Sequence, residues 1–462
     1  MFLIKKSHKR FKMELTLIGL GINSGDLSFS AFEKIKSSEC VIVRTELAES
    51  VKFLKEQGIS YISLDDEYRK SRNFDTLSKN LAKRVLSLSK EKSCCYLVDG
   101  AVSEDSSCKI ILKKHKNACV YEGVSKAKYA LTRCGIASPS FTAYSAYDLD
   151  KFSRFTFPLV IFDLDNFVLA SEWKIKLSEF IGEEQKVWLY IDKQPKLISL
   201  YELDRFISYD YSTAVVVDEI PLLEKTRFDF DDLFEIVELL RAPNGCPWDR
   251  EQTPESIRKN LIEECYELAD AIDQSDDDKI CEEIGDVILQ AVFHLIFAKE
   301  RGAFSKTDAL SDECAKLIFR HSHIFGTDKA TNASGALDVW DKNKQIEKGF
   351  STPSDYVLDV PKSFPALLRT QKSIKRVSKY QKSDATFSSI KHAINEILEK
   401  LEKGENAVKN SGSLLFLACL ILKKLGVDGE ESLYFAVDNF VSEFAKTEKD
   451  FDCEKYVESL IN

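Results

Sequence analysis

The stretch "NLIEECYELADAIDQSDDDKICEEIGDVIL", residues 260–289, places five glutamates and six aspartates beside apolar residues at helical spacing. Glu264 and Glu267 stand three residues apart, as do Glu283 and Asp286. Residues at positions i and i+3 lie on one face of a helix, with about 5 to 6 Å between them. The polar break "QSDDD" separates two helices, so an antiparallel hairpin is expected to direct all four carboxylates into one space.

Four carboxylates in one space need a cation. Without one they repel each other, and some of their pKa values rise. Mg²⁺ prefers oxygen ligands and keeps waters that a phosphate can replace, and Mn²⁺ is an alternative. Basic residues at helical offsets suggest a polyphosphate, because Lys279 lies four residues before Glu283, and Lys316 and Arg320 are four apart. The spacing predicts a site for a divalent cation and a polyphosphate, and the competing interpretation is a solvated acidic surface.

The composition limits the other classes of protein. A chain of 462 residues is long enough for about two to four domains. Its net charge of -10 argues against a general nucleic-acid or anionic-membrane binder, because such surfaces need clustered Lys and Arg. Twelve cysteines without a regular framework indicate reduced, mostly buried thiols and no cysteine-bound metal.

Neither the basic segment at residues 1–13 nor the apolar run at residues 413–422 suggests a membrane protein. The basic segment at residues 1–13 is not followed by an apolar stretch of signal-peptide length. The apolar run "SLLFLACLIL", residues 413–422, is too short to span a bilayer. A cytoplasmic protein with neither a membrane nor a nucleic-acid partner is expected.

The two halves of the chain show different periodicities. Residues 14–220 alternate short β-rich runs with amphipathic stretches, which predicts an α/β domain. From residue 228 onward apolar residues recur at helical spacing, so the second half is expected to be all-α. The β-rich runs are "LTLIGLG" (15–21), "CVIVRT" (40–45), "YISL" (61–64), "CCYLVDG" (94–100), "LVIFDLD" (159–165), "VWLYID" (187–192) and "AVVVDEI" (214–220).

The helical half also contains an internal repeat. The acidic hairpin has a later counterpart in "NEILEKL" followed by "KNSGSLLFLACLILKKLGVD". Glu396 and Glu399 preserve the first carboxylate pair, but Asn410 and Ser413 replace the second. Losing half of the carboxylates should abolish metal binding there. Residues 361–449 are therefore interpreted as a degenerate second copy, retained for packing or dimerisation.

The segments "LLRAPNGCPWDREQTPESIRKNLIEECYELADAI", "CEEIGDVILQAVFH", "FRHSHIFG" and "VWDKNKQIEK" together resemble the MazG nucleoside triphosphate pyrophosphohydrolases, whose motif is EExxE followed by ExxD. The resemblance covers residues 229–348 and places the first helical domain at 228–350. It implies an all-α, homodimeric, Mg²⁺-dependent enzyme that splits a nucleoside triphosphate into the monophosphate and pyrophosphate.

The resemblance also implies roles for particular residues. Glu263 is a possible water-orienting base beside the metal ligands, and Trp340 is either a nucleotide contact or a core-packing residue. The implied metal ligands are Glu264, Glu267, Glu283 and Asp286, which are also catalytic, and the implied phosphate contacts are Lys279, Lys316 and Arg320.

The first half, in "LTLIGLGINSGDLSFSAFEKIKSSECVIVRTE" and "PLVIFDLDNFVLASEWKIKL", resembles the tetrapyrrole methylase family, which in some bacterial proteins precedes a MazG domain. That resemblance implies an S-adenosylmethionine cleft lined by Gly19, Gly21, Asp99 and Gly100. Two loops depart from the family pattern. Ile22 and Asn23 stand where the family has Pro-Gly, and "VDGAVSED" lacks the prolines of the later cofactor loop. Both departures disfavour methyl transfer.

Three classes of function follow from these patterns. The first is a nucleoside triphosphate pyrophosphohydrolase carried by the first helical domain. The second is an S-adenosylmethionine-dependent methyltransferase, which the altered loops disfavour. The third is a non-catalytic protein in which both halves have lost activity, and the survival of all four carboxylates argues against it.

Overall fold

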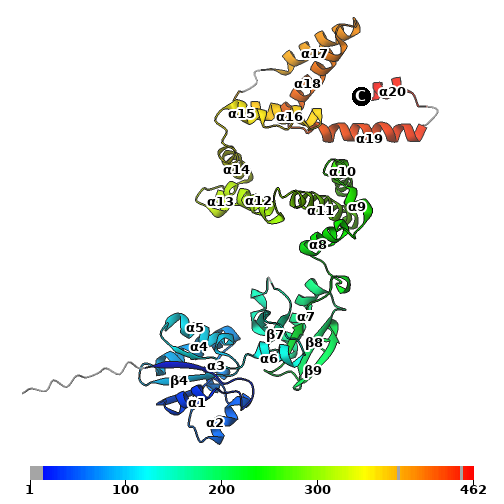
Figure 1. The fold of residues 1–462 in the computed structure, drawn as a ribbon. Helices are drawn as coiled ribbons and strands as arrows, with labels where there is room; N and C mark the ends of the chain where they lie inside the picture. Colours follow the sequence, from blue (N-terminus) through cyan, green and yellow to red (C-terminus); the bar gives the residue numbers. More distant parts are fainter. Residues whose placement is uncertain (1–13, 154, 382–384, 448–450, 462) are drawn as a thin grey trace, which may run out of the picture. The chain divides into compact units, whose positions relative to one another are not determined.

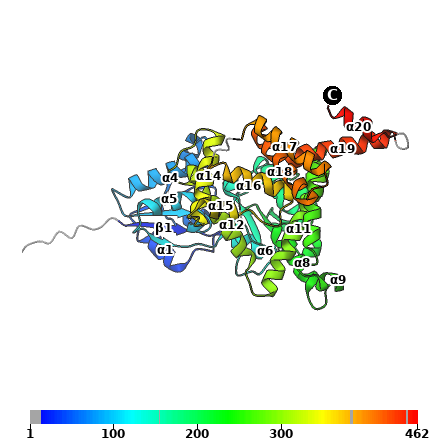
Figure 2. The same cartoon turned by 90° about the horizontal axis from the view of Figure 1, so that it is seen from above.

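The computed structural model describes residues 14–153, 155–381, 385–447 and 451–461 (Figures 1 and 2). The basic segment at residues 1–13 lies outside the described residues. The chain divides into two compact units, Met1–His294 and Leu295–Asn462. The three domain ranges expected from the sequence, 14–220, 228–350 and 361–449, stay predictions.

The first sheet is parallel throughout and has the strand order β3-β2-β4-β1-β5. Every residue of β1 and β4 is buried, because α4 and α5 cover one face of the sheet and α1 and α2 cover the other (Figure 1). The strands are β1 Leu15–Gly19, β2 Cys40–Val43, β3 Ile62–Ser63, β4 Cys94–Val98 and β5 Cys119–Tyr121. The helices are α1 Phe29–Lys36, α2 Lys52–Glu56, α3 Asp65–Lys70, α4 Phe74–Leu88 and α5 Ser106–Lys114.

The second sheet is mixed and has the order β6-β7-β10-β8-β9, with β6 and β7 parallel and the other pairs antiparallel. Helix α7 (Phe167–Ile181) packs the fully buried Trp173 against one face, and α6 (Lys126–Arg133) packs against the other. The strands are β6 Thr142–Ser145, β7 Leu159–Phe162, β8 Lys186–Ile191, β9 Gln194–Ser199 and β10 Ala214–Val217. All seven predicted runs contain a strand, whereas β5, β6 and β9 were not predicted.

Helices make up the rest of the chain, and no strand follows β10 among the described residues, so the predicted change from α/β to all-α is confirmed. The first-unit helices are α8 Phe230–Arg241, α9 Pro247–Glu251 and α10 Arg258–Gln274, and α11 Asp277–Glu300 contains the boundary between the units. Those of the second unit are α12 Lys306–Arg320, α13 Ser322–Phe325, α14 Ala333–Glu347, α15 Pro353–Leu358, α16 Ala366–Val377, α17 Phe387–Glu402, α18 Ala407–Leu425, α19 Gly429–Thr447 and α20 Cys453–Ser459.

Within the described residues, no helix combines the length and the apolar character needed to cross a membrane.

All twelve cysteines are free thiols, as predicted, but only six of them are buried and four are exposed. The expectation that most of the thiols are buried is therefore wrong, because cysteines such as Cys265 and Cys281 lie on solvent-facing sides of helices.

Candidate active site

A tight turn places α10 and α11 against each other. Ser275 ends α10 in the left-handed conformation, with φ of 55°, and the backbone N–H of Lys279 donates to the Asp276 side chain at 3.2 Å. Asp277 and Asp278 occupy the first turn of α11, where negative charge interacts favourably with the helix dipole. The polar break seen in the sequence is thus a C-cap and an N-cap in direct succession.

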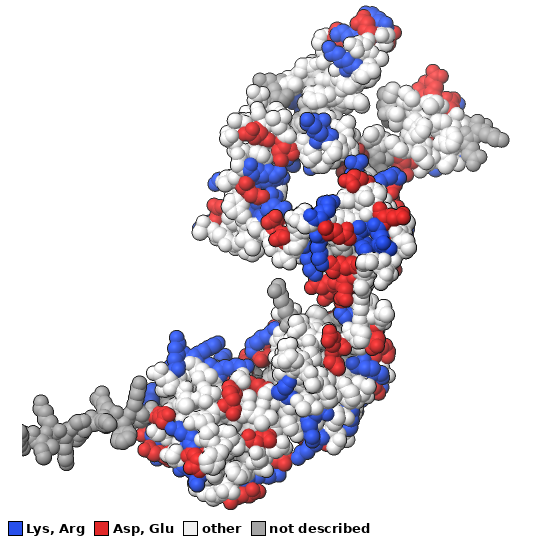
Figure 3. All heavy atoms as spheres, in the orientation of Figure 1, with Lys and Arg blue, Asp and Glu red and all other residues white. Residues whose placement is uncertain are grey.

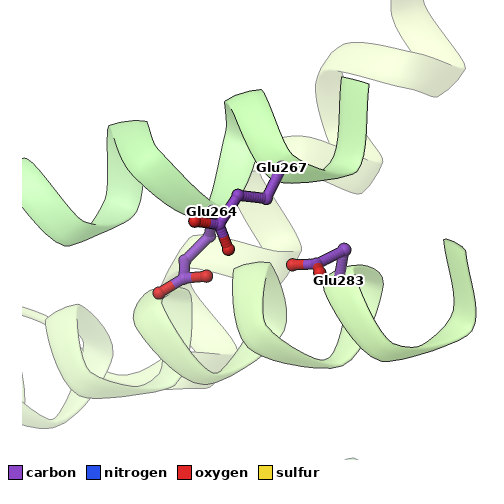
Figure 4. A group of neighbouring side chains, drawn as sticks. All are labelled: Glu264, Glu267 and Glu283. Atoms are coloured by element: carbon purple, nitrogen blue, oxygen red, sulfur yellow. The ribbon is translucent and has the colours of Figure 1, made fainter. Parts of the chain in front are cut away.

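The turn brings three carboxylates together. Glu264 and Glu267 project from α10 and Glu283 projects from α11, and one oxygen of each lies within 4.8 Å of the others (Figure 4). Glu264 and Glu283 are half-buried, whereas Glu267 is exposed. The buried Oε2 atom of Glu283 has no hydrogen-bond partner among the described residues. A buried, unpartnered carboxylate oxygen facing two other carboxylates is a suitable ligand for a hard divalent cation.

The electrostatics of the group match this geometry. Burial and the neighbouring charges of Asp286 and Glu267 raise the pKa of Glu264. A hydrogen bond from Gln290 opposes this rise in part. Burial and the charges on Glu267 and Asp286 likewise raise the pKa of Glu283. Asp286 lies outside the group of three, yet its charge acts on both of these glutamates. Two of the predicted ligands therefore carry negative charge at an energetic cost in the metal-free protein.

A cleft of about 410 Å³ opens beside these carboxylates. Lys279 lies on its wall with Glu267 and Glu283, and its Nζ donates to Gln274 Oε1 at 3.1 Å. The cleft is lined by Tyr266, Glu267, Asp270, Ala271, Lys279, Glu282 and Glu283. The structure therefore brings the predicted phosphate-contacting Lys279 together with two of the predicted metal ligands.

Glu263 lies next to Glu264 in the sequence but makes a different contact. Its carboxylate pairs with Lys259 Nζ at 2.6 Å, one turn earlier on the exposed side of α10. It is not one of the three clustered carboxylates. Its role as a water-orienting base stays a prediction.

The second unit carries the remaining predicted contacts. Lys316 pairs with Glu313, and Arg320 donates from Nε and Nη2 to the two oxygens of Glu347 at 2.6 and 3.1 Å. The Arg320 guanidinium also lies 5.1 Å from the centre of the Trp340 ring. Trp340 is half-buried, so it is neither a core residue nor fully exposed. Arg320 and Trp340 thus form one local group within this unit.

Lys344 belongs to the same group and was missed in the sequence. Its Nζ lies 4.9 Å from the Trp340 ring, and burial together with Arg376, Lys348 and Arg320 lowers its pKa. Figure 3 shows basic side chains gathered around α14, which carries Lys344. The spacing of four residues from Trp340 could have identified it. A lysine surrounded by other cations is stabilised when an anion binds.

The later hairpin, α17 and α18, lacks a comparable group. Its Asn410 side chain donates to the Glu405 carbonyl at 2.5 Å, and the Ser413 hydroxyl donates to the Lys409 carbonyl at 3.0 Å. Within the part of the chain that the structure describes, the cluster on α10 and α11 is the single group of three such potential ligands. The side chains that replace the second carboxylate pair therefore bond to their own backbone.

In the α/β half, the four glycine and aspartate residues proposed to line a cofactor cleft lie at the ends of two adjacent strands. Gly19 is the last residue of β1, and Asp99 and Gly100 directly follow β4. Gly21 and Gly100 pair in an isolated antiparallel bridge. The structure therefore brings these residues together at the ends of β1 and β4, and their role in binding a cofactor stays a prediction.

Comparison with known proteins agrees with the geometry of the helical hairpin. The family model described as the MazG nucleotide pyrophosphohydrolase domain matches residues 252–325, which include all four predicted metal ligands. The nucleoside triphosphate pyrophosphohydrolase/pyrophosphatase MazG of Thermotoga maritima is 37% identical over 224 residues, covering 48% of this chain and 86% of that protein. The chain belongs to the MazG family.

Similarity also extends outside the MazG domain. YabN of Bacillus subtilis is 26% identical over 382 residues, which are 78% of this chain and 76% of that protein. A solved uroporphyrin-III-C-methyltransferase of Thermus thermophilus is similar over 45% of this chain and 94% of its own, with a TM-score of 0.36 and 16% identity.

The raised pKa values predict how the stability of the metal-free protein depends on pH. A carboxyl group whose pKa is higher in the folded state binds more protons there, so the free energy of unfolding should rise as pH falls through the raised pKa. The gain should be complete near the ordinary value of 4.5. In EDTA, the difference in melting temperature between wild type and a Glu264→Gln/Glu283→Gln variant should be largest at neutral pH and shrink toward that value. Parallel melting curves at every pH would contradict it.

Proposed function

We propose that the MazG domain hydrolyses nucleoside triphosphates to monophosphates and pyrophosphate with Mg²⁺, or Mn²⁺ in its place. The observation that carries the proposal is the convergence of Glu264, Glu267 and Glu283 from two helices beside an open cleft. Membership of the MazG family supports it, since the relative from Thermotoga maritima has a name that states this activity.

The residues present fit the proposed cation. Their ligand atoms are carboxylate oxygens, and one carboxylate of the group, that of Glu283, has a buried oxygen without a hydrogen-bond partner among the described residues. Glu264, Glu267 and Glu283 would hold the ion, with Asp286 as the fourth proposed ligand, whose charge already acts on Glu264 and Glu283 in the metal-free protein. When bound, Mg²⁺ neutralises phosphate oxygens and increases the acidity of water in the site.

The chain's own residues would orient the substrate and balance its charge. Lys279 on the wall of the cleft is suited to a phosphate oxygen, and Lys316 and Arg320 are proposed to offset the charge of the departing pyrophosphate. Trp340, with Lys344 close to its ring, is suited to the nucleotide. Water breaks the anhydride bond between the α- and β-phosphates, so this reaction needs no covalent nucleophile.

A homodimer in the cytoplasm is part of the same proposal. Helices α10 and α11 expose apolar side chains as well as carboxylates: Tyr266 is 62% exposed, Ile262 51% and Ile284 43%. Contiguous exposed apolar side chains on a helical surface are typical of protein–protein interfaces. A second copy of the chain would cover them.

The first test identifies the products. The purified protein should release pyrophosphate and the nucleoside monophosphate from several nucleoside triphosphates, and EDTA should abolish the activity until Mg²⁺ or Mn²⁺ is restored. The reason is the carboxylate group, which needs a cation to receive a polyphosphate. Products can be separated by anion-exchange chromatography. Orthophosphate and nucleoside diphosphate as products would rule out this reaction.

Asp286→Asn separates metal binding from helix stability. The substitution keeps the size of the side chain but removes charge, so turnover with Mg²⁺ should fall by about two orders of magnitude, or ~3 kcal/mol of barrier. The metal-free variant should melt at the same or a higher temperature than the wild type. The reason is that the charge of Asp286, which the variant lacks, raises the pKa of both Glu264 and Glu283. Turnover and melting in EDTA are measured on the same preparation. Near-normal turnover would remove Asp286 from the site.

Glu264→Ala and Glu396→Ala form a matched pair on the two hairpins. The first substitution should abolish turnover, whereas the second should leave it within about three-fold of wild type, a difference below ~1 kcal/mol of barrier. The reason is that Asn410 and Ser413 bond to the backbone of α18 and its preceding turn and supply no carboxylate. Steady-state rates at saturating Mg²⁺ provide the measurement. Equal losses in the two variants would mean that the second hairpin is also catalytic.

A further inference from the structure

The crevice at the carboxyl ends of β1 and β4 is where an open α/β sheet ordinarily receives its ligand. The resemblance of this half to tetrapyrrole methylases implies S-adenosylmethionine there. Whether the cofactor fits depends on three properties of the crevice: the free backbone donors, the charge and the space.

The two loops that would enclose a cofactor are bonded to each other. The N–H of Gly100 donates to the Gly21 carbonyl at 2.9 Å, and the N–H of Gly21 donates to the Gly100 carbonyl at 3.2 Å. A Cβ atom on Gly19 would lie 2.5 Å from both the Gly100 carbonyl oxygen and the Gly123 nitrogen. The glycines are therefore required for the close packing of three backbone segments, which accounts for them without a ligand.

The chain's own carboxylates accept from the backbone donors of these loops. Glu104 accepts from the N–H groups of Lys126 at 2.8 Å and Ala127 at 3.1 Å, which are the first turn of α6. Asp105 accepts from the N–H of Cys108 at 2.7 Å at the start of α5. In the loop after β1, the Asp26 carboxylate likewise accepts from backbone donors, the N–H groups of Ile22 and Asn23, at 2.9 and 2.8 Å. These donors are already paired and are not free to bind a ligand.

The chain also supplies two cations to the floor of the crevice. Lys126 Nζ pairs with Asp99 and, at 2.6 Å, with Asp163, which follows β7 of the second sheet. Arg44 pairs with Asp99 at 3.3 Å and with Asp105 at 3.2 Å. The side chains of Lys126 and Arg44 are both only 9% exposed. These aspartates therefore have buried cationic partners from the chain itself.

The space around this network consists of two very small pockets and one larger cleft. The spaces on either side of the Asp99 and Lys126 pair are about 20 and 10 Å³, which is enough for one water molecule at most. The larger cleft, of about 430 Å³, is lined by Arg44, Lys126 and two of their aspartate partners, and its wall also has aromatic side chains. In that cleft the guanidinium of Arg44 lies 5.9 Å from the ring of Tyr68 and 5.4 Å from that of Phe74. The ring faces that the sulfonium cation of S-adenosylmethionine would contact therefore already lie next to the Arg44 guanidinium.

We propose that Arg44 and Lys126 occupy the position of a cationic cofactor, so that the α/β half does not bind S-adenosylmethionine and instead forms a rigid module clamped by Lys126. Asp99 directly follows a strand of the first sheet and Asp163 a strand of the second, and Lys126 bridges them. The residues do not fit the cofactor that the fold family implies. The crevice has become an interface between the two sheets.

The first experiment measures cofactor binding to the unmodified full-length chain. Equilibrium dialysis with labelled S-adenosylmethionine, and separately with S-adenosylhomocysteine, should show no saturable binding up to about 1 mM, a range that detects dissociation constants of ~1 mM or tighter. Saturable binding with one site per chain anywhere in that range would overturn the proposal. Because no variant is involved, the result does not depend on whether a mutant folds.

The second experiment tests the clamp with a matched pair of lysines on α6. Lys126→Met removes the bridge between the sheets, whereas Lys128→Met removes an exposed lysine whose Nζ donates to the Ser138 carbonyl and lies 5.5 Å from the centre of the Phe141 ring. Amide hydrogen exchange of residues 99–105 and 163–166 should quicken by about tenfold or more in the first variant and stay unchanged in the second. Nucleotide turnover should be the same in both. Equal exchange in the two variants would contradict the clamp.

Discussion

Mutual repulsion among the carboxylates of α10 and α11 is the constraint on which the helical hairpin depends. Oxygens of Glu264, Glu267 and Glu283 lie within 4.8 Å of one another, and burial and neighbouring charges raise the pKa of two of these groups. Folding alone gains nothing from this arrangement, since an apolar or neutral residue at any of the three positions would relieve it. The capped turn at Ser275 and Asp276 nevertheless fixes the two helices so that the charges meet. An arrangement that weakens the metal-free protein is best explained by what it binds.

The carboxylate site could be predicted from the sequence because its determinants are local. Two i, i+3 pairs separated by a short polar turn specify the relative position of the side chains within one hairpin, whatever the rest of the chain does. Six of the seven predicted β-runs form central, largely buried strands and were predictable for a similar reason, since buried strands are mostly apolar, whereas the seventh, β3, is a short edge strand. Strands β5, β6 and β9 were missed because each is short or includes exposed residues, and β9 contains Pro195. Their pairing depends on neighbours distant in sequence.

Long-range contacts account for the other features that the sequence did not indicate. Lys126 is one basic residue in the stretch "SKAKYA", and nothing nearby shows that it is buried between Asp99 and Asp163. The altered loops indicated that methyl transfer was doubtful. They did not indicate which side chains occupy the cofactor crevice. Lys344 was missed although its spacing from Trp340 was visible, because an isolated lysine on a helix is usually a solvated residue.

The two halves of the chain respond to crowded carboxylates in opposite ways. In the α/β half, the buried cations Arg44 and Lys126 neutralise Asp99 and Asp163, so the cluster is complete without a ligand. In the hairpin, Lys279 on the wall of the cleft bonds to Gln274, and Glu264, Glu267 and Glu283 form no ion pair among the contacts of the described residues. Carboxylates that are neutralised by the chain's own cations are typical of a structural junction between elements. Carboxylates without such partners are typical of a site that binds a cation from solution. The same chemical groups therefore indicate different functions, and the distinction rests on where the balancing charge comes from.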